Sequence, residues 1–191
     1  MEQQLTGIRA LFGSASNISW LAALLLLSLV TLSTNAATPE LQTPAPVIYL
    51  AENIDEKDEL GWCIDTLGRG WSEQLHTHSC KPQGGDVQFS YNKETHQIMS
   101  VEFPGKCATL HEVAAAGVSF DLLDCSATSA GQVFIYNAET LEFMPEGDRS
   151  LCIVAGAESR SAGPFMSRDL ELAPCAATDA SLKQWVVKDN M

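Results

Sequence analysis

The sequence is short of basic residues. Its 191 residues include 11 Lys and Arg against 24 Asp and Glu, a formal net charge of −13 at pH 7. Nucleic acids and anionic membrane surfaces are bound through clustered Lys and Arg, so this composition argues against both as partners. The acidic excess is more simply explained as a source of solubility.

Long apolar runs are also missing. The nearest candidate, Trp20–Leu32, is shorter than the roughly 20 residues that cross a bilayer. It follows Arg9 and precedes Thr34-Asn35-Ala36-Ala37, small residues of the kind that a signal peptidase reads. We predict that residues 1–36 are a secretory signal peptide, with an uncleaved anchor as the alternative, and that the product is secreted or periplasmic. Residues 37–46, with three prolines, are expected to be an extended lead-in.

The spacing of an amphipathic helix is absent as well. The closest window, Leu110–Val118, is ended by Gly117, and we allow it one helical turn. Short strand-like segments instead alternate with Gly- and Pro-containing turns. No Asn-x-Ser/Thr sequence occurs after residue 36, so no N-glycan is expected. The segments predicted as strands are 47–50, 62–66, 74–79, 87–91, 97–103, 106–110, 119–124, 132–136, 141–145, 151–154, 165–172 and 183–187.

One seven-residue stretch occurs twice. Phe89–Thr95 (FSYNKET) recurs 45 residues later as Phe134–Thr140 (FIYNAET), with five of seven positions identical. The cysteines keep nearly the same period: Cys63, Cys107 and Cys152 form one series, and Cys80, Cys125 and Cys175 form another. A period of about 45 residues indicates three copies of one unit. The third copy is longer, and its extra residues fall in the loop 159–167.

The six cysteines predict three disulfides, because the chain is expected to be secreted. Six cysteines allow fifteen pairings. The repeat selects one of them, since equivalent copies should close equivalent loops. We predict Cys63–Cys80, Cys107–Cys125 and Cys152–Cys175. With all cysteines paired and no supported Ser–His–Asp or Cys–His arrangement, we expect neither an enzyme nor a bound cofactor.

Three units with four short strands each predict an all-β protein with the β-trefoil fold over residues 47–191. Six strands would form a barrel and three hairpins would cap one end, which removes exposed sheet edges. A four-bladed propeller would need a fourth unit. The predicted core consists of Ile64, Phe89, Ile98, Val101, Leu110, Phe120, Leu122, Phe134, Phe143, Ile153, Leu170, Leu172, Trp185 and Val187.

The motifs of the three copies resemble the ricin-type (R-type) lectin domain. The resemblance covers about residues 47–190 and implies a carbohydrate-binding protein, with galactose-type sugars as the first guess for the ligand. It rests on a first cysteine, a second cysteine and a Gln-x-aromatic element in each copy. These read Cys63-Ile64-Asp65, Cys80 and Val87-Gln88-Phe89; Cys107-Ala108-Thr109, Cys125 and Gln132-Val133-Phe134; and Cys152-Ile153-Val154, Cys175 and Lys183-Gln184-Trp185.

The resemblance also implies where a sugar would bind. In this family an Asp after the first cysteine accepts hydrogen bonds from sugar hydroxyls. An aromatic residue before the second cysteine stacks on the sugar ring, and a nearby Asn adds donors. In the first copy these positions hold Asp65, His78 and Asp86. Trp71, Gln74 and the neighbouring His76 could complete the site.

The other two copies depart from this pattern. The corresponding positions hold Thr109, Leu123 and Gly131 in the second copy and Val154, Ala173 and Leu182 in the third, although Gln132 remains. We therefore expect a single, weak sugar site in the first copy, without the gain in avidity that several sites provide.

Other interpretations of the same residues stay open. Asp65 could cap the turn that follows it. His76 and His78 could lie on a polar strand face, or hold a metal with Asp65 or Asp86. The acidic run 52–59 is expected to be a solvated loop rather than a calcium site. As a whole, the protein could instead be a protein-interaction trefoil that has lost sugar binding, such as a toxin accessory subunit or an inhibitor.

Overall fold

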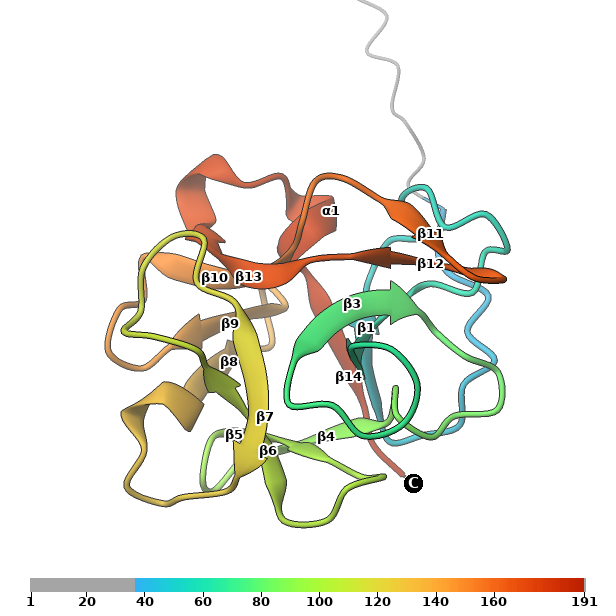
Figure 1. The fold of residues 1–191 in the computed structure, drawn as a ribbon. Coiled ribbons are helices and arrows are strands. Elements are labelled where there is room, and N and C mark those ends of the chain that lie inside the picture. Colours follow the sequence, from blue (N-terminus) through green and yellow to red (C-terminus); the bar gives the residue numbers. More distant parts are fainter. Residues whose placement is uncertain (1–36, 191) are drawn as a thin grey trace, which may run out of the picture. The chain divides into compact units, whose positions relative to one another are not determined.

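A computed structural model describes residues 37–190, so the predicted signal peptide lies outside the described residues (Figure 1). No helix in the described part is long and apolar enough to cross a membrane. Residues 37–190 contain three short helical turns: η1 (Ala130–Gln132), η2 (Cys175–Ala177) and α1 (Ala180–Lys183). The strands are β1 (Val47–Leu50), β2 (Trp62–Thr66), β3 (Leu75–Ser79), β4 (Phe89–Asn92), β5 (Gln97–Ser100), β6 (Lys106–Leu110), β7 (Phe120–Asp124), β8 (Phe134–Asn137), β9 (Glu142–Pro145), β10 (Leu151–Ala155), β11 (Arg160–Ala162), β12 (Phe165–Arg168), β13 (Leu170–Pro174) and β14 (Trp185–Lys188).

The threefold repeat is visible in the strand pairing. Five-residue antiparallel ladders join β2 to β3, β6 to β7 and β10 to β13. Four-residue antiparallel ladders join β4 to β5, β8 to β9 and β14 to β1, the last pair closing the chain on itself. The all-β class and the β-trefoil fold are therefore confirmed.

The duplicated seven-residue stretch forms equivalent hairpins between β4 and β5 and between β8 and β9. Asn92 Oδ1 accepts hydrogen bonds from the backbone N–H groups of Glu94 and Thr95. Asn137 Oδ1 accepts the equivalent bonds from Glu139 and Thr140. Such bonds are how Asn stabilises a tight turn. The hydroxyl of Tyr91 donates to the Phe134 carbonyl, and that of Tyr136 donates to the Trp185 carbonyl. We call the part of the fold formed by one copy of the repeat a lobe. Each copy of the motif thus bonds its own lobe to the next.

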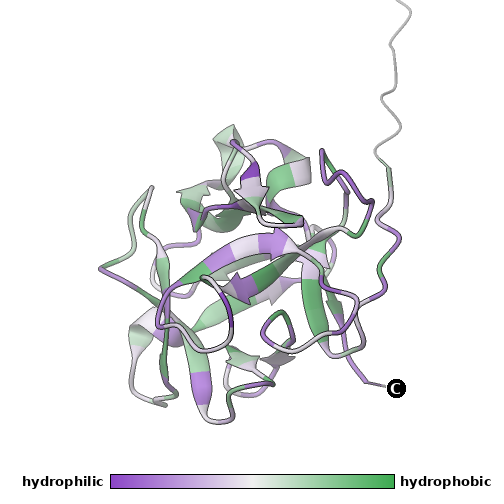
Figure 2. Cartoon of the chain, turned by 45° about the vertical axis from the view of Figure 1, so that its right-hand side comes forward, coloured by the Kyte–Doolittle hydropathy of each residue, from purple (hydrophilic) through white to green (hydrophobic). Residues whose placement is uncertain are grey.

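The core is built from the buried side chains of the strands. Strands β2, β3 and β10 are buried at every position, whereas β4 and β9 alternate between buried and partly buried positions, and Figure 2 shows hydrophobic and hydrophilic residues alternating along several strands. Twelve of the fourteen predicted core residues are buried. Val187 is only partly buried. Val101 was wrongly assigned to the core, because β5 ends at Ser100 and Val101 lies in the turn beyond it, 39% exposed.

All three disulfides are confirmed: Cys63–Cys80, Cys107–Cys125 and Cys152–Cys175. In each lobe the backbone N–H of the second cysteine also donates to a carbonyl. The acceptor residue directly precedes the strand that contains the first cysteine. The acceptors are Gly61, Gly105 and Ser150. The repeated covalent link is therefore accompanied by a repeated hydrogen bond.

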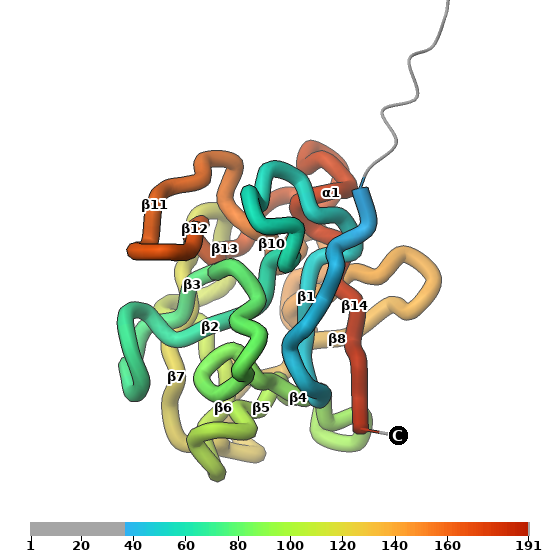
Figure 3. The backbone as a smooth tube through the Cα atoms, turned by 90° about the vertical axis from the view of Figure 1, so that its right-hand side faces the viewer, coloured from blue at the N-terminus to red at the C-terminus, as the bar shows by residue number. Residues whose placement is uncertain are grey.

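The third lobe departs from the predicted pattern. The segment 165–172, expected as one strand, is divided by Asp169 into β12 and β13. The extra residues of the third copy form the hairpin β11–β12. Strand β12 then pairs with β3 of the first lobe, giving a sheet with the order β11-β12-β3-β2-β1-β14 (Figures 1 and 3).

Two smaller expectations also need correction. The segment 111–118 forms bends and turns rather than a helical turn. The lead-in 37–46 has no regular secondary structure, as expected, but it packs on the domain. Pro39 is buried against Gly61, and the Thr43 hydroxyl donates to the Lys81 carbonyl at 2.8 Å.

Candidate functional site

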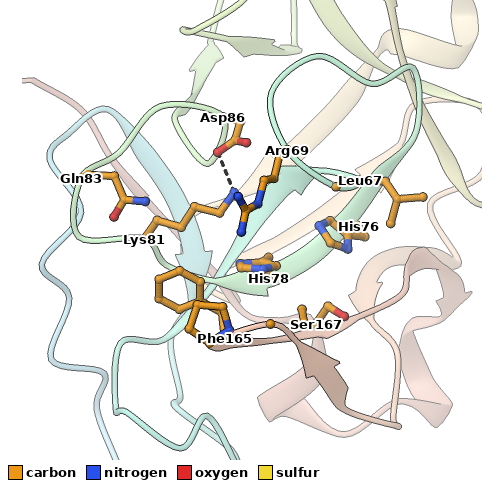
Figure 4. Close-up of a pocket in the computed structure, with 13 residues that line it drawn as sticks. Leu67, Arg69, His76, His78, Lys81, Gln83, Asp86, Phe165 and Ser167 are labelled. Atoms are coloured by element: carbon orange, nitrogen blue, oxygen red, sulfur yellow. Dashed lines mark hydrogen bonds and ion pairs between the residues drawn. The ribbon is translucent and has the colours of Figure 1, made fainter.

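A pocket of about 590 Å³ opens where β3 meets the β11–β12 hairpin (Figure 4). Its walls come from the β2–β3 loop, from the segment that runs from β3 toward β4, and from the hairpin of the third lobe. The lining residues are Leu67, Gly68, Arg69, His76, His78, Lys81, Gln83, Asp86, Ala162, Gly163, Pro164, Phe165 and Ser167. Two lobes far apart in sequence therefore share one pocket.

Asp65 lies beneath the pocket rather than in it. Its side chain is fully buried, and Oδ1 accepts a hydrogen bond from the Thr66 backbone N–H at 2.8 Å. The Nζ atom of Lys81 lies 2.8 Å from the other oxygen, Oδ2. A direct hydrogen bond from a sugar hydroxyl to Asp65 does not fit this geometry, because the carboxylate is covered by Lys81.

Lys81 is the polar centre of the site. Its Nζ lies between Asp65 and Asp86, donating to Asp86 Oδ1 at 2.7 Å. The second oxygen of Asp86 accepts the Gly70 N–H at 3.1 Å. Burial alone would lower the pKa of Lys81, but attraction to the two carboxylates and hydrogen bonds with them raise it above its usual value. Lys81 is therefore charged, and it links the buried carboxylate to the pocket.

The two histidines lie side by side on β3, with ring centroids 5.3 Å apart. His78 Nδ1 donates to the Ser79 carbonyl at 2.9 Å, which leaves Nε2 as the acceptor of the neutral ring. Burial lowers the pKa of His78, and the Ser79 carbonyl and Asp65 oppose this shift only in part. His78 is therefore mainly neutral at pH 7.

A metal site does not fit these residues. The nearest histidine nitrogens are each 3.7 Å from Asp65 Oδ2, and Lys81 already occupies that oxygen. No group of three His, Cys, Asp or Glu residues within 37–190 is placed to hold a metal ion.

Phe165 places an aromatic ring at the pocket wall. The first lobe itself has only His78 at the position where the sequence predicts an aromatic residue. Phe165 lies on β12, and its ring meets His78 edge to face at a centroid distance of 5.5 Å. The sequence indicated only that the third copy was longer. That the extra residues reach the first lobe follows from the pairing of Ser167 with His78 and of Arg168 with Thr77.

Buried polar contacts support the hairpin, and one of them joins it to β3. The Arg168 guanidinium donates to the carbonyls of Gly156 and Ala157 at 2.6 and 2.7 Å, and it also pairs with Asp55. The Ser79 hydroxyl donates to Glu56 Oε1 at 2.7 Å and accepts the Met166 N–H at 3.0 Å.

Glu56 also corrects an expectation about the acidic run 52–59. Its other oxygen, Oε2, accepts backbone N–H groups of Asp58 and Leu60. Glu56 is 3% exposed, so it is a structural acceptor rather than part of a solvated loop.

Trp71 and Gln74 do not line the pocket. Trp71 is 46% exposed and packs on Phe103 at 5.2 Å between ring centroids, with Lys106 Nζ 4.8 Å from its ring centre. Gln74 is exposed, and its backbone carbonyl accepts the Leu67 N–H. Of the six residues proposed for the site, His76, His78 and Asp86 line the pocket, and Asp65 lies directly below it.

The second lobe uses its retained Gln132 for structure. The Gln132 amide nitrogen donates to the Thr109 hydroxyl and to the Asp124 carbonyl, both at 2.9 Å. Its oxygen accepts from Gln97 and from the Ser126 N–H. Leu123, at the expected aromatic position, is 38% exposed.

The third lobe has a pocket of about 250 Å³ whose lining includes Val154, Ala173 and Leu182. These three residues occupy the positions at which the lectin resemblance predicts polar and aromatic groups. The polar constellation is therefore restricted to the first lobe.

Comparison with known proteins supports the fold. No protein-family profile and no curated protein sequence matches this chain. Among solved structures, the chain is similar to the agglutinin from Abrus precatorius, with a TM-score of 0.55 and 14% identity over 76% of this chain and 47% of that one. GalNAc-T7, solved with UDP, GalNAc and Mn²⁺, gives a TM-score of 0.47 and 18% identity over 67% of this chain and 20% of that one.

The chain thus spans about half the length of the agglutinin chain that it matches. At this identity the likeness defines the fold alone. The protein has a β-trefoil fold like that of the agglutinin, with three disulfides.

Proposed function

We propose that this protein is a secreted carbohydrate-binding protein with one weak site, the first-lobe pocket. The observation that carries the proposal is the combination of Phe165 with several polar side chains in a pocket of about 590 Å³. That volume lies within the range of roughly 300–1,000 Å³ in which proteins bind small ligands. The three disulfides suit an oxidising compartment such as a periplasm or the cell exterior.

The chemistry of the pocket matches the chemistry of a sugar ring. A pyranose has an apolar face of C–H groups and a rim of hydroxyls, so it is recognised by an aromatic surface and a few fixed polar groups. Phe165 supplies the aromatic surface. Lys81 and Gln83 supply donors, and neutral His78 offers Nε2 as an acceptor. Asp65 acts indirectly, by holding the Lys81 ammonium in place.

A glycan array, followed by titration calorimetry with the best sugar, tests the proposal. We expect Phe165→Ala to weaken binding at least tenfold, because it removes the aromatic surface without disturbing the Lys81 ion pairs. Trp71→Ala is the matched control, since Trp71 is an exposed aromatic residue outside the pocket. Retention of no glycan by the folded protein would overturn the proposal, and so would equal losses in the two variants.

The second candidate is a protein-interaction trefoil without sugar binding. It is favoured by the second and third lobes, where Leu123 and Val154 replace the residues of a sugar site. This alternative is supported if the wild-type protein binds no glycan and the Phe165→Ala variant keeps its fold and disulfides.

A further inference from the structure

We propose that the first-lobe pocket prefers an acidic saccharide, with a carboxylate or sulfate group placed between Arg69 and Lys81. This inference rests on the proposed sugar-binding function and specifies its ligand class. It follows from an excess of hydrogen-bond donors and of positive charge among the side chains that a ligand would meet.

The carboxylate acceptors at the pocket are already satisfied. Asp86 is the one carboxylate among the described lining residues, and both of its oxygens accept hydrogen bonds, from Lys81 Nζ and from the Gly70 N–H. Asp65, the acceptor that the lectin pattern would use, is fully buried. A neutral sugar hydroxyl that needs to donate therefore finds few free partners.

The donor side is open. Arg69 is exposed and forms no ion pair with any residue in the described part of the chain, and Figure 4 shows its guanidinium directed toward the middle of the pocket near Lys81. The Lys81 ammonium has three N–H groups and two carboxylate partners, which leaves one N–H for a ligand. Arg binds carboxylate and sulfate-like groups with two parallel hydrogen bonds, which are stronger than bonds between neutral groups.

His76 is a buried polar residue at the wall of this pocket that lacks a hydrogen-bond partner. His76 is 5% exposed and lines the pocket, and neither of its ring nitrogens has a hydrogen-bond partner. A buried polar group without a partner lowers stability, and such groups are uncommon in native proteins.

The charge of the whole protein works against this preference. At −13 it repels anions in general, so any preference for an acidic sugar has to come from the pocket itself. This makes Arg69 the decisive residue. Its matched control is Arg149, another exposed arginine, located in the turn before β10 and outside the pocket.

The test measures dissociation constants of the purified, disulfide-intact protein by titration calorimetry at pH 7. The ligands are two matched pairs, methyl galactoside with methyl galacturonide and methyl glucoside with methyl glucuronide, together with methyl galactoside 6-sulfate. Within each pair only the C6 group differs, a hydroxymethyl against a carboxylate. We expect the acidic member of at least one pair, or the sulfate, to bind at least tenfold more tightly than its neutral parent. Arg69→Gln should remove that difference, and Arg149→Gln should retain it.

The outcomes separate the two proposals. A sulfate preference without a uronide preference supports the inference and identifies sulfate as the anionic group. Neutral sugars that bind as tightly as the acidic ones overturn the inference and leave the sugar-binding function standing. A preference that persists in Arg69→Gln also overturns it. Absence of binding to all five ligands and to every glycan on the array overturns both.

Discussion

The ion pair between Lys81 and Asp65 leads to a sharp prediction about stability. Replacing Lys81 with Met keeps most of the side chain's length but removes its charge. The Asp65 side chain is 0% exposed and that of Lys81 is 9% exposed, so the change leaves a buried carboxylate without its counter-charge. Removal of one partner from a buried ion pair costs about 3–5 kcal/mol. We expect the lower end, about 3 kcal/mol, because the Thr66 N–H still donates to Asp65.

Thermal unfolding followed by circular dichroism measures this effect. For a domain of this size, about 3 kcal/mol corresponds to a fall in Tm of roughly 6–12 °C. Lys106→Met is the matched control, because Lys106 Nζ is also 2.8 Å from a carboxylate, that of Asp124, whose side chain is 90% exposed. Exposed pairs contribute about 0.5 kcal/mol. If Lys81→Met lowers Tm no more than Lys106→Met does, burial of the pair is not what makes it important.

A double-variant cycle separates the ion pair from other effects of the substitution. Asp65→Asn combined with Lys81→Met removes both charges while preserving the shape of residue 65. We expect the double variant to be more stable than the sum of the single variants predicts, by about 2 kcal/mol. Additive losses would show that Lys81 stabilises the domain through packing alone.

Four further predictions concern the supports of the fold and the site. Because burial lowers the pKa of His78, the unfolded chain binds a proton that the folded chain does not as the pH falls below about 6.5; unfolding experiments should show lower stability at pH 5.5 than at pH 7.5, and a smaller difference in His78→Gln. Arg168→Met should lower stability by about 3 kcal/mol, because it removes buried bonds to the Gly156 and Ala157 carbonyls. Hydrogen exchange at the Met166 and Ser167 amides should then quicken, and an unchanged rate would contradict the role given to Arg168. Gln132→Met should cost about 2 kcal/mol in chemical denaturation while leaving ligand binding in the first lobe unchanged, since its four hydrogen bonds all lie in the second lobe. Replacing Cys107 and Cys125 together with Ser should cost about 3 kcal/mol, as expected for a loop of 18 residues, and a loss below 1 kcal/mol would show that the unfolded chain is already restricted there.

The repeat made the fold predictable because the same physical requirements recur in each copy. Each first cysteine needs a partner at a similar distance along the chain, so the three disulfides followed from their spacing. The duplicated stretch is preserved because Asn92 and Asn137 form the hairpin turns, and Tyr91 and Tyr136 bond to the following lobe. These are local contacts or contacts at one fixed period, and a sequence displays them directly.

The site was less predictable because its partners do not follow the period. Lys81 directly follows a cysteine, and its position gives no sign that it contacts both Asp65 and Asp86. Trp71 is close to the site in sequence but packs toward Phe103 and Lys106, because the β2–β3 loop turns away toward the second lobe. Val101 has the character of a core residue, yet it lies just past the end of its strand.

The insertion in the third lobe makes the three lobes unequal. Three identical lobes would present three equivalent sites, but β12 adds a strand beside β3 in the first lobe alone. All five residues of β3 are buried as a result, although two of them are histidines. The same strand brings Phe165 to the pocket wall. The second and third lobes lack the polar residues of the first, and only the first has the additional wall, so the polar pocket of this trefoil lies in one lobe.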